Sequence, residues 1–285
     1  MQAILTSLKI STWTNSIVDK QITTEVTQSK GAKDKALRVS KKKLAGDTLA
    51  KLTKLCGVAR TEHYRLTASW DDGIRVLPLA LRAEYERTMD EISIEFNRLV
   101  TQFCGEYPDL VQQARIDLGE AFKPEDYPMS PEHKFAFRWE FSPIPEANHF
   151  VIGGLIDAEK VKLESDFERY RVRLQSDNER RIQGMHADIL ERALTPIQRL
   201  TEKLSDSEAI FRDSLVENVR ESMRVLETLN IESNPTLAAL RQTIGEQLSN
   251  LDADMLRENK VLRRSTAEAA GQIVKVFNNN AVRKF

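Results

Sequence analysis

The stretch Tyr127–Pro145, YPMSPEHKFAFRWEFSPIP, decides how the chain is divided. Its aromatic residues Phe135, Phe137, Trp139 and Phe141 alternate with smaller or charged ones. A period of two is typical of a half-buried β-strand. We therefore expect a strand whose aromatic face belongs to a protein core, and we prefer this interpretation to a platform on which nucleic-acid bases stack.

Strand-like and helical patterns are mixed on the N-terminal side of this stretch. Ile4–Trp13 alternates as a strand does, and the apolar spacing over residues 49–63 is helical. Residues 14–35 are polar and fit a short helix or a mobile arm. An Asp72-Gly73 turn lies between two apolar runs, which predicts a β-hairpin.

Prolines and glycines suggest where the next helices end. The spacing of apolar residues predicts a helix over residues 79–104, stopped by Gly105 and Pro108. Asp109 is then expected to cap a second helix that ends at Gly119. Between the aromatic strand and Gly153-Gly154 we expect a loop, with one more short strand over residues 149–152.

Beyond Gly153-Gly154 almost every pattern is helical. Thr195-Pro196 is expected to start or kink a helix, and Ser205–Glu208 has the form of a capping box. Asn234-Pro235 should open another helix, and a last one is expected from Asp252 to about Phe277.

These patterns predict an α+β protein: a small antiparallel sheet with packed helices, followed by an extended helical hairpin or bundle. The predicted domains are 1–152, mixed α+β, and 153–285, built from long helices. Helices of roughly 35 residues would span about 50 Å, which exceeds a compact core. Self-association into a homo-oligomer is therefore expected. The apolar repeat is irregular, so a bundle is favoured over a long coiled coil.

The composition indicates a chain without a membrane span or a disulfide framework. The formal net charge is −1, no window approaches 18 apolar residues, and Cys56 and Cys104 stand alone. Two isolated cysteines suggest a reducing compartment. The first residues lack the pattern of a signal peptide, and a cytoplasmic location is expected.

Positive charge is concentrated between Lys30 and Arg65. Eleven basic residues face three acidic ones there, which leaves +8 in a chain whose total is −1. Such asymmetry can bind phosphate groups of nucleic acids. The candidate nucleic-acid-binding residues are basic side chains of this segment: Lys30, Lys33, Lys35, Arg38, Lys41, Lys42, Lys43, Lys51, Lys54 and Arg60.

Two further interpretations concern this segment. Tyr64 and Trp70 lie close by in sequence and could stack on bases. Alternatively, Lys41–Lys43 form a solvated loop and Trp70 belongs to the hairpin core.

Motifs for enzymatic chemistry are missing from the sequence. It contains no GxxxxGK[ST] or GxGxxG phosphate loop, so nucleotide use by a standard motif is not expected. The four histidines form no HxxxH or HxH pair, and neither metal nor cofactor is expected. Asp71-Asp72 is better explained by the turn than by acid–base catalysis.

Several segments together resemble a family of uncharacterised phage and mobile-element proteins. They include LKISTW, ARTEHYRLTASWDDGIRVLP, FNRLVTQF, YPDL, LGEAFKPEDYP and FAFRWEFSPIPEANHF, within residues 5 to about 150. The hairpin Trp70–Pro78 matches the family's W-x-D-G-x-R-x-L-P pattern. The resemblance implies a bacterial host cytoplasm and assigns no activity or catalytic residue.

The expected function is accordingly non-enzymatic: a self-associating interaction protein of a phage or mobile element, with DNA or RNA bound by the basic segment. Two alternatives stay open. One is an adaptor or inhibitor that binds a host protein through its long helices. The other is an enzyme of a type without a recognisable motif.

Overall fold

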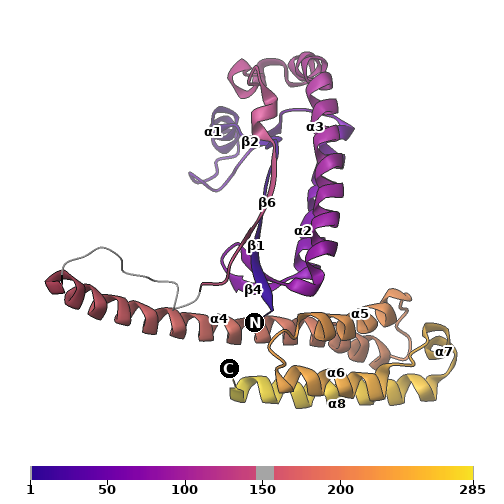
Figure 1. Cartoon of the computed structure of the whole chain (residues 1–285). Helices are drawn as coiled ribbons and strands as arrows, with labels where there is room; N and C mark the ends of the chain where they lie inside the picture. The colour runs from indigo at the N-terminus through magenta and orange to yellow at the C-terminus, as the bar shows by residue number, and fades with distance from the viewer. Residues whose placement is uncertain (1, 146–156, 285) are drawn as a thin grey trace. The chain divides into compact units, whose positions relative to one another are not determined.

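The computed structural model describes residues 2–145 and 157–284, with the backbone alone at 157–167 and 279–284 (Figure 1). The strands and longer helices follow in this order: β1 (Ala3–Ser11), β2 (Ser16–Val18), α1 (Lys20–Ser29), β3 (Ser40–Lys42), α2 (Asp47–Leu66), β4 (Ala68–Asp71), β5 (Ile74–Pro78), α3 (Arg82–Leu118), β6 (Ala136–Ser142), α4 (Asp157–Ser205), α5 (Ser214–Leu229), α6 (Pro235–Leu248), α7 (Ala253–Glu258) and α8 (Lys260–Lys284). The predicted α+β class, with a small antiparallel sheet and packed helices, is confirmed.

A sheet with the strand order β4-β5-β1-β6 holds the predicted hairpin. β4 and β5 pair antiparallel and are joined at Gly73, whose φ of +68° is left-handed. Glycine adopts this conformation without the steric cost of a Cβ. β1 pairs antiparallel with β5, with Leu5 opposite Val76. The predicted hairpin and first strand are therefore confirmed.

The aromatic strand β6 alternates as predicted, with Phe137, Trp139 and Phe141 half-buried and the residues between them exposed. The ring centroid of Phe137 lies 5.5 Å from that of Phe96 on α3. That of Trp139 lies 5.9 Å from Tyr85. Edge-to-face and tilted contacts of this kind stabilise aromatic cores. These side chains pack inside the protein, as expected.

The chain forms two compact units that alternate along the sequence. Unit 1 comprises Met1–Ser7, Tyr64–Glu84 and Glu140–Phe285, and unit 2 comprises Leu8–His63 and Tyr85–Trp139. The predicted domains were consecutive, with a boundary at Gly153-Gly154, which lies outside the described residues, as does the short strand expected at 149–152. Within this division, β1 and β6 each belong partly to both units.

Each unit has its own apolar core. In unit 1, Leu5, Trp70 and Val76 of the sheet join a cluster with the buried faces of α4–α8. There α4 packs along α5 and α8, so the predicted helical bundle is present. In unit 2, α2 and α3 pack together through Leu52, Phe96 and their neighbours.

The predicted helix end at Pro108 is wrong, because α3 runs without interruption from Arg82 to Leu118. A proline inside a helix removes one hydrogen bond and costs about 3 kcal/mol. Phe103 and Tyr107, directly before it, are buried, and Ala114 beyond it is buried too. The Tyr107 hydroxyl also donates to the Pro128 carbonyl at 2.9 Å. Burial on both sides of the proline offsets its cost.

Thr195-Pro196 does not start a helix, since α4 continues through it, and a kink, the other outcome expected there, stays a prediction. The capping box at residues 205–208 does not form either, because α5 begins only at Ser214. Instead the buried Arg263 of α8 donates to the carbonyls of Lys203 and Ala209 at 3.1 and 2.8 Å. The Arg263 guanidinium group thus donates to a carbonyl in the last turn of α4, although the two residues are distant in the sequence.

The two final predictions for the helical region have different outcomes. Asn234 caps α6 as expected, with its side-chain oxygen accepting from the backbone N–H groups of Thr236 and Leu237. The single last helix is divided into α7 and α8. Asn259 lies at the break, where its side chain accepts from Val261 N–H and so starts the second helix.

Asp188 of α4 joins the hairpin to the bundle in unit 1. Its carboxylate accepts from the backbone N–H of Ser69 at 3.0 Å and pairs with Arg75 at 3.4 Å. Arg192, one turn further along α4, donates to the Thr67 carbonyl at 2.8 Å. Since β4 is an edge strand, α4 covers backbone groups that would otherwise be open to pairing.

His186 of α4 contacts the cap of α6, and the contact fixes its tautomer. The side-chain oxygen of Asn234 accepts from two backbone N–H groups, so its NH₂ group faces His186 Nδ1 at 3.1 Å. Nδ1 must therefore accept, and Nε2 carries the proton. Within the described residues, buried Nε2 has no hydrogen-bond partner. Burial lowers the pKa of His186, against an opposing effect of Glu232.

Protonation of His186 should weaken the bundle. A histidine whose pKa is lower in the folded than in the unfolded state stabilises the fold above about pH 6.5 and loses this contribution as the pH falls. The added proton at Nδ1 would also face the Asn234 NH₂ group. We expect the free energy of unfolding, measured by denaturant titration, to decrease between pH 8 and pH 5.5 by an amount on the order of RT, about 0.6 kcal/mol.

A comparison of two variants isolates this effect. His186→Gln keeps an acceptor for Asn234 but cannot titrate, so its stability should depend less on pH. His133→Gln is the matched control, because the His133 side chain is 81% exposed. An unchanged pH dependence in His186→Gln would exclude this role of His186.

Candidate nucleic-acid interface

Six of the ten candidate residues belong to, or lie between, the elements of a small motif of unit 2. The motif comprises β2, α1, the loop 30–39 and β3, and is here named the β2–α1–β3 motif. β2 and β3 pair antiparallel, with Ile17 opposite Lys41. Of the two interpretations of the polar segment 14–35, a short helix or a mobile arm, the helix is confirmed as α1, which lies between the two strands in the sequence.

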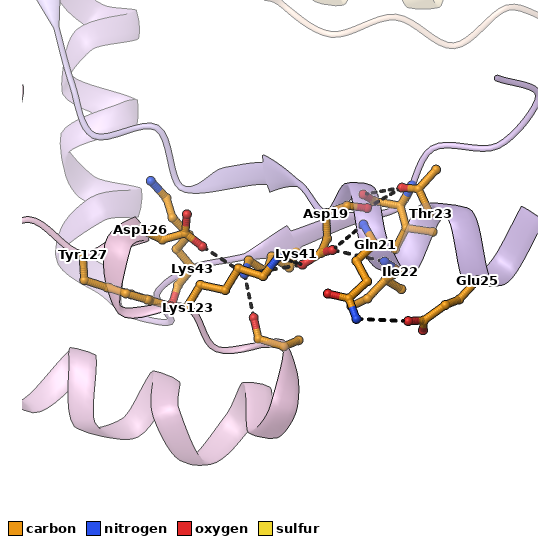
Figure 2. Close-up of polar contacts among 12 residues, drawn as sticks. Asp19, Gln21, Ile22, Thr23, Glu25, Lys41, Lys43, Lys123, Asp126 and Tyr127 are labelled. Carbon is orange, nitrogen blue, oxygen red and sulfur yellow. Dashed lines mark hydrogen bonds and ion pairs between the residues drawn. The ribbon is translucent and has the colours of Figure 1, made fainter.

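Strand alternation turns Lys41 inward and Lys42 outward. Lys42 and Ser40 are exposed, whereas the side chain of Lys41 is only 7% exposed. Its ammonium group lies 2.9 Å from the carboxylate of Asp126 and 3.6 Å from that of Asp19 (Figure 2). It also donates to the Ala121 carbonyl at 2.6 Å. Lys41 is therefore unavailable to a ligand.

Asp19 connects this buried charge cluster to α1. Its carboxylate caps the helix by accepting from Gln21 N–H and Ile22 N–H, both at 3.1 Å (Figure 2). The pKa of Asp19 is lowered chiefly by the Ile22 N–H, with Lys123 and Lys41 acting in the same direction against desolvation. Lys123 lies 3.8 Å from it. Two cations and two carboxylates, those of Lys41, Lys123, Asp19 and Asp126, thus balance in the cluster.

The remaining cations of the motif point into solvent. Two exposed acids, Glu25 and Asp34, oppose six exposed basic residues: Lys20, Lys30, Lys33, Lys35, Arg38 and Lys42. The surface therefore carries an excess of four positive charges, in a protein whose formal net charge is −1. Such an excess attracts polyanions.

Lys43 has a different environment from its two neighbours. It is half-buried, with its ammonium group 4.2 Å from the centre of the Trp13 ring. Burial is the main cause that lowers its pKa. Its backbone carbonyl accepts from the Tyr127 hydroxyl at 2.9 Å (Figure 2). Lys43 consequently packs against the core of unit 2.

A cleft of about 450 Å³ brings Lys42 of β3 and Lys54 of α2 together. Trp13, Gly46 directly before α2, and Leu49 and Ala50 of its first turn also line it. Two candidate cations that are twelve residues apart in sequence thus face one concave surface. Lys51 and Arg60, the remaining candidates, are exposed on α2.

The two proposed stacking residues, Tyr64 and Trp70, belong to unit 1 and not to unit 2. Trp70 is 6% exposed and belongs to the core of unit 1, so the interpretation as hairpin core is confirmed. Tyr64 is exposed, but it lies in unit 1 with the Arg75 guanidinium over its ring at 4.6 Å. Lys20 is an exposed cation of the motif that the sequence analysis did not include, because it lies outside the basic segment that begins at Lys30. Its position directly after Asp19, the cap of α1, was a signal that the sequence offered.

Neither a metal centre nor a membrane-spanning helix is found among the described residues. Among residues 2–145 and the described side chains beyond, no group of three or more His, Cys, Asp or Glu could hold a metal ion. In the same ranges no helix has both the length and the apolar character needed to cross a membrane.

Comparisons with known proteins give no assignment. No protein-family model, curated protein or solved structure matches this chain. The resemblance to phage and mobile-element proteins, the self-association and the host-protein partner therefore stay predictions.

The inward and outward neighbours on β3 should respond very differently to substitution. Lys41→Met leaves two buried carboxylates without their main cation, which should lower the free energy of unfolding by about 3 kcal/mol. Lys42→Met, with the same change of side chain on the exposed face, should alter it by less than about 0.5 kcal/mol. Urea titration followed by tryptophan fluorescence measures both. Equal stability of the two variants would contradict the structural role of Lys41.

Proposed function

We propose that this protein is a non-enzymatic nucleic-acid-binding protein of a phage or mobile element. Its β2–α1–β3 motif and the adjoining face of α2 hold the sugar-phosphate backbone. The proposal rests on one observation: six exposed cations gather on the motif, while the charge of the whole chain is close to zero. Lysine and arginine side chains that neutralise phosphates release counterions, and this release favours binding.

The way in which the motif is held supports a preformed surface. Lys41 is paired inside unit 2, and Asp19 caps α1, so the strands and the helix that present the cations are held together. A preformed surface loses less conformational entropy on binding than a disordered basic tail.

The composition of the motif favours contacts with the backbone over contacts with bases. Residues 16–42 contain no aromatic side chain on which a base could stack. We therefore assign to the motif binding without strong sequence preference, and no advantage of single strands over duplex.

The cleft between β3 and α2 is the centre of the proposed surface. Lys42 and Lys54 line it together, and Lys51, three residues before Lys54 on α2, adds an exposed positive charge on the same side of the helix. Cations on two elements can contact successive phosphates of one strand, which a single flexible loop does less well.

Salt dependence of binding tests the proposal. The full-length protein should bind a labelled DNA duplex of mixed sequence in fluorescence anisotropy, with affinity falling steeply as salt rises. The variant Lys30→Glu/Lys33→Glu/Lys35→Glu changes exposed side chains only. It should weaken binding strongly and reduce the slope of log K against log salt by about 3, if each lysine contacts one phosphate. RNA of the same sequence serves as a second probe.

A charge-matched control separates the motif from a general effect of net charge. Arg199→Glu/Lys260→Glu/Lys275→Glu reverses three exposed cations of unit 1. It should retain most of the affinity. Equal losses in both variants, or no binding of the unmodified protein at low salt, would refute the assignment of the interface.

A further inference from the structure

A second cleft, of about 480 Å³, lies in unit 1 between β4 and α4. Three arginines of α4 line it: Arg173, Arg180 and Arg181. Two carboxylates, Asp177 of α4 and Asp71 of β4, oppose them. The cleft therefore has one positive charge in excess, and its residues belong to unit 1, whereas the interface described above belongs to unit 2.

Helical spacing places these side chains on one face of α4. Asp177, Arg180 and Arg181 follow Arg173 by four, seven and eight residues, and Gly184 follows it by eleven. Residues at such intervals share one side of an α-helix. The arginines therefore face the same strand edge.

Arg181 is held in place, whereas the other two arginines keep free donors. Arg181 donates twice to the Asp71 carboxylate, at 2.7 and 3.0 Å, and its guanidinium lies 5.9 Å from the centre of the Trp70 ring. Arg180 pairs with Asp177. Arg173 lies 4.0 Å from the same carboxylate, beyond hydrogen-bonding distance.

Both of these arginines are open to a ligand. Their side chains are 82% and 72% exposed, for Arg173 and Arg180 respectively. Each guanidinium group has five N–H donors, and one shared carboxylate cannot satisfy two such groups. An oxyanion that enters the cleft would replace water at these donors with charge-assisted hydrogen bonds.

Gly184 leaves room beside the arginines. A Cβ at this position would meet no heavy atom within 4 Å, so packing does not require glycine here. Glycine inside a helix is less favourable than alanine by about 1 kcal/mol. The buried Met185 and Trp70 form an apolar floor next to it.

We propose that this cleft binds the phosphate group of a small phosphorylated molecule of nucleotide size. Guanidinium groups bind phosphate through parallel, charge-assisted hydrogen bonds. A carboxylate has two oxygens, whereas a phosphate group offers three and can bridge more than one arginine. The volume of about 480 Å³ lies within the range of small-molecule sites.

Calorimetric titration of the full-length protein tests this assignment. Inorganic phosphate is the first probe and should bind with a Kd on the order of millimolar. A mixture of nucleoside monophosphates is the second probe and should bind more tightly if the apolar floor contributes. Arg173→Ala/Arg180→Ala should weaken the binding of both probes by about tenfold or more. Arg199→Ala, an exposed arginine elsewhere on α4, should leave it unchanged.

Filling the cleft provides a test that removes no charge. Gly184→Leu should weaken binding while leaving the protein at least as stable, because leucine is a better helix former. Gly57→Leu is its control, because a Cβ at Gly57 of α2 also meets open space. This control should bind phosphate normally.

Three results would overturn the proposal: no binding of either probe, equal binding by the double arginine variant, or equal binding by Gly184→Leu. If the double variant loses affinity only for a DNA duplex, the ligand is a nucleic-acid backbone and the small-molecule assignment is wrong. The proposed function is tested separately, by the charge reversal of Lys30, Lys33 and Lys35 in unit 2.

Discussion

The buried pairing of Lys41 with Asp126 and Asp19 determines how the basic segment is presented. A lysine inside a protein must be paired, because an isolated buried charge is strongly destabilising. Once Lys41 points inward, the pleat of β3 turns its neighbours outward. The same carboxylate of Asp19 that accepts this pairing caps α1. One charge cluster thereby sets the direction of a strand and the start of a helix, and the exposed cations follow from both.

Local signals in the sequence predicted the elements that depend on local chemistry. The aromatic alternation of β6, the Asp72-Gly73 turn and the cap at Asn234 all act within a few residues, and all three are confirmed. The failures share a different cause. α3 passes through Pro108 because side chains on both sides of it are buried, and the end of α4 is satisfied by Arg263, more than fifty residues away. The periodicity of apolar residues along the sequence carries no information about partners this far away.

The candidate site was predicted only in part, again because some of its features depend on partners that are distant in the sequence. The net charge of the segment was visible, and most of its lysines are exposed as expected. Which of the lysines is buried depends on its partner Asp126, which lies 85 positions after Lys41 in the chain. That Lys42 and Lys54 line one cleft depends on the tertiary arrangement of β3 and α2. The arginine-lined cleft had no signal at all, because half of it comes from a hairpin a hundred residues before α4.

The alternation of the two units along the chain has a consequence for how such a gene can change. Tyr127–Pro145 looked like a divider between halves, yet β6 belongs to both units, and the hairpin before it shares a core with the helices after it. A single crossover anywhere in the gene cannot transfer one unit without a part of the other. Genomes that exchange segments by recombination must therefore inherit the two units together. A substitution in one unit will then be selected in the presence of the other unit's sequence.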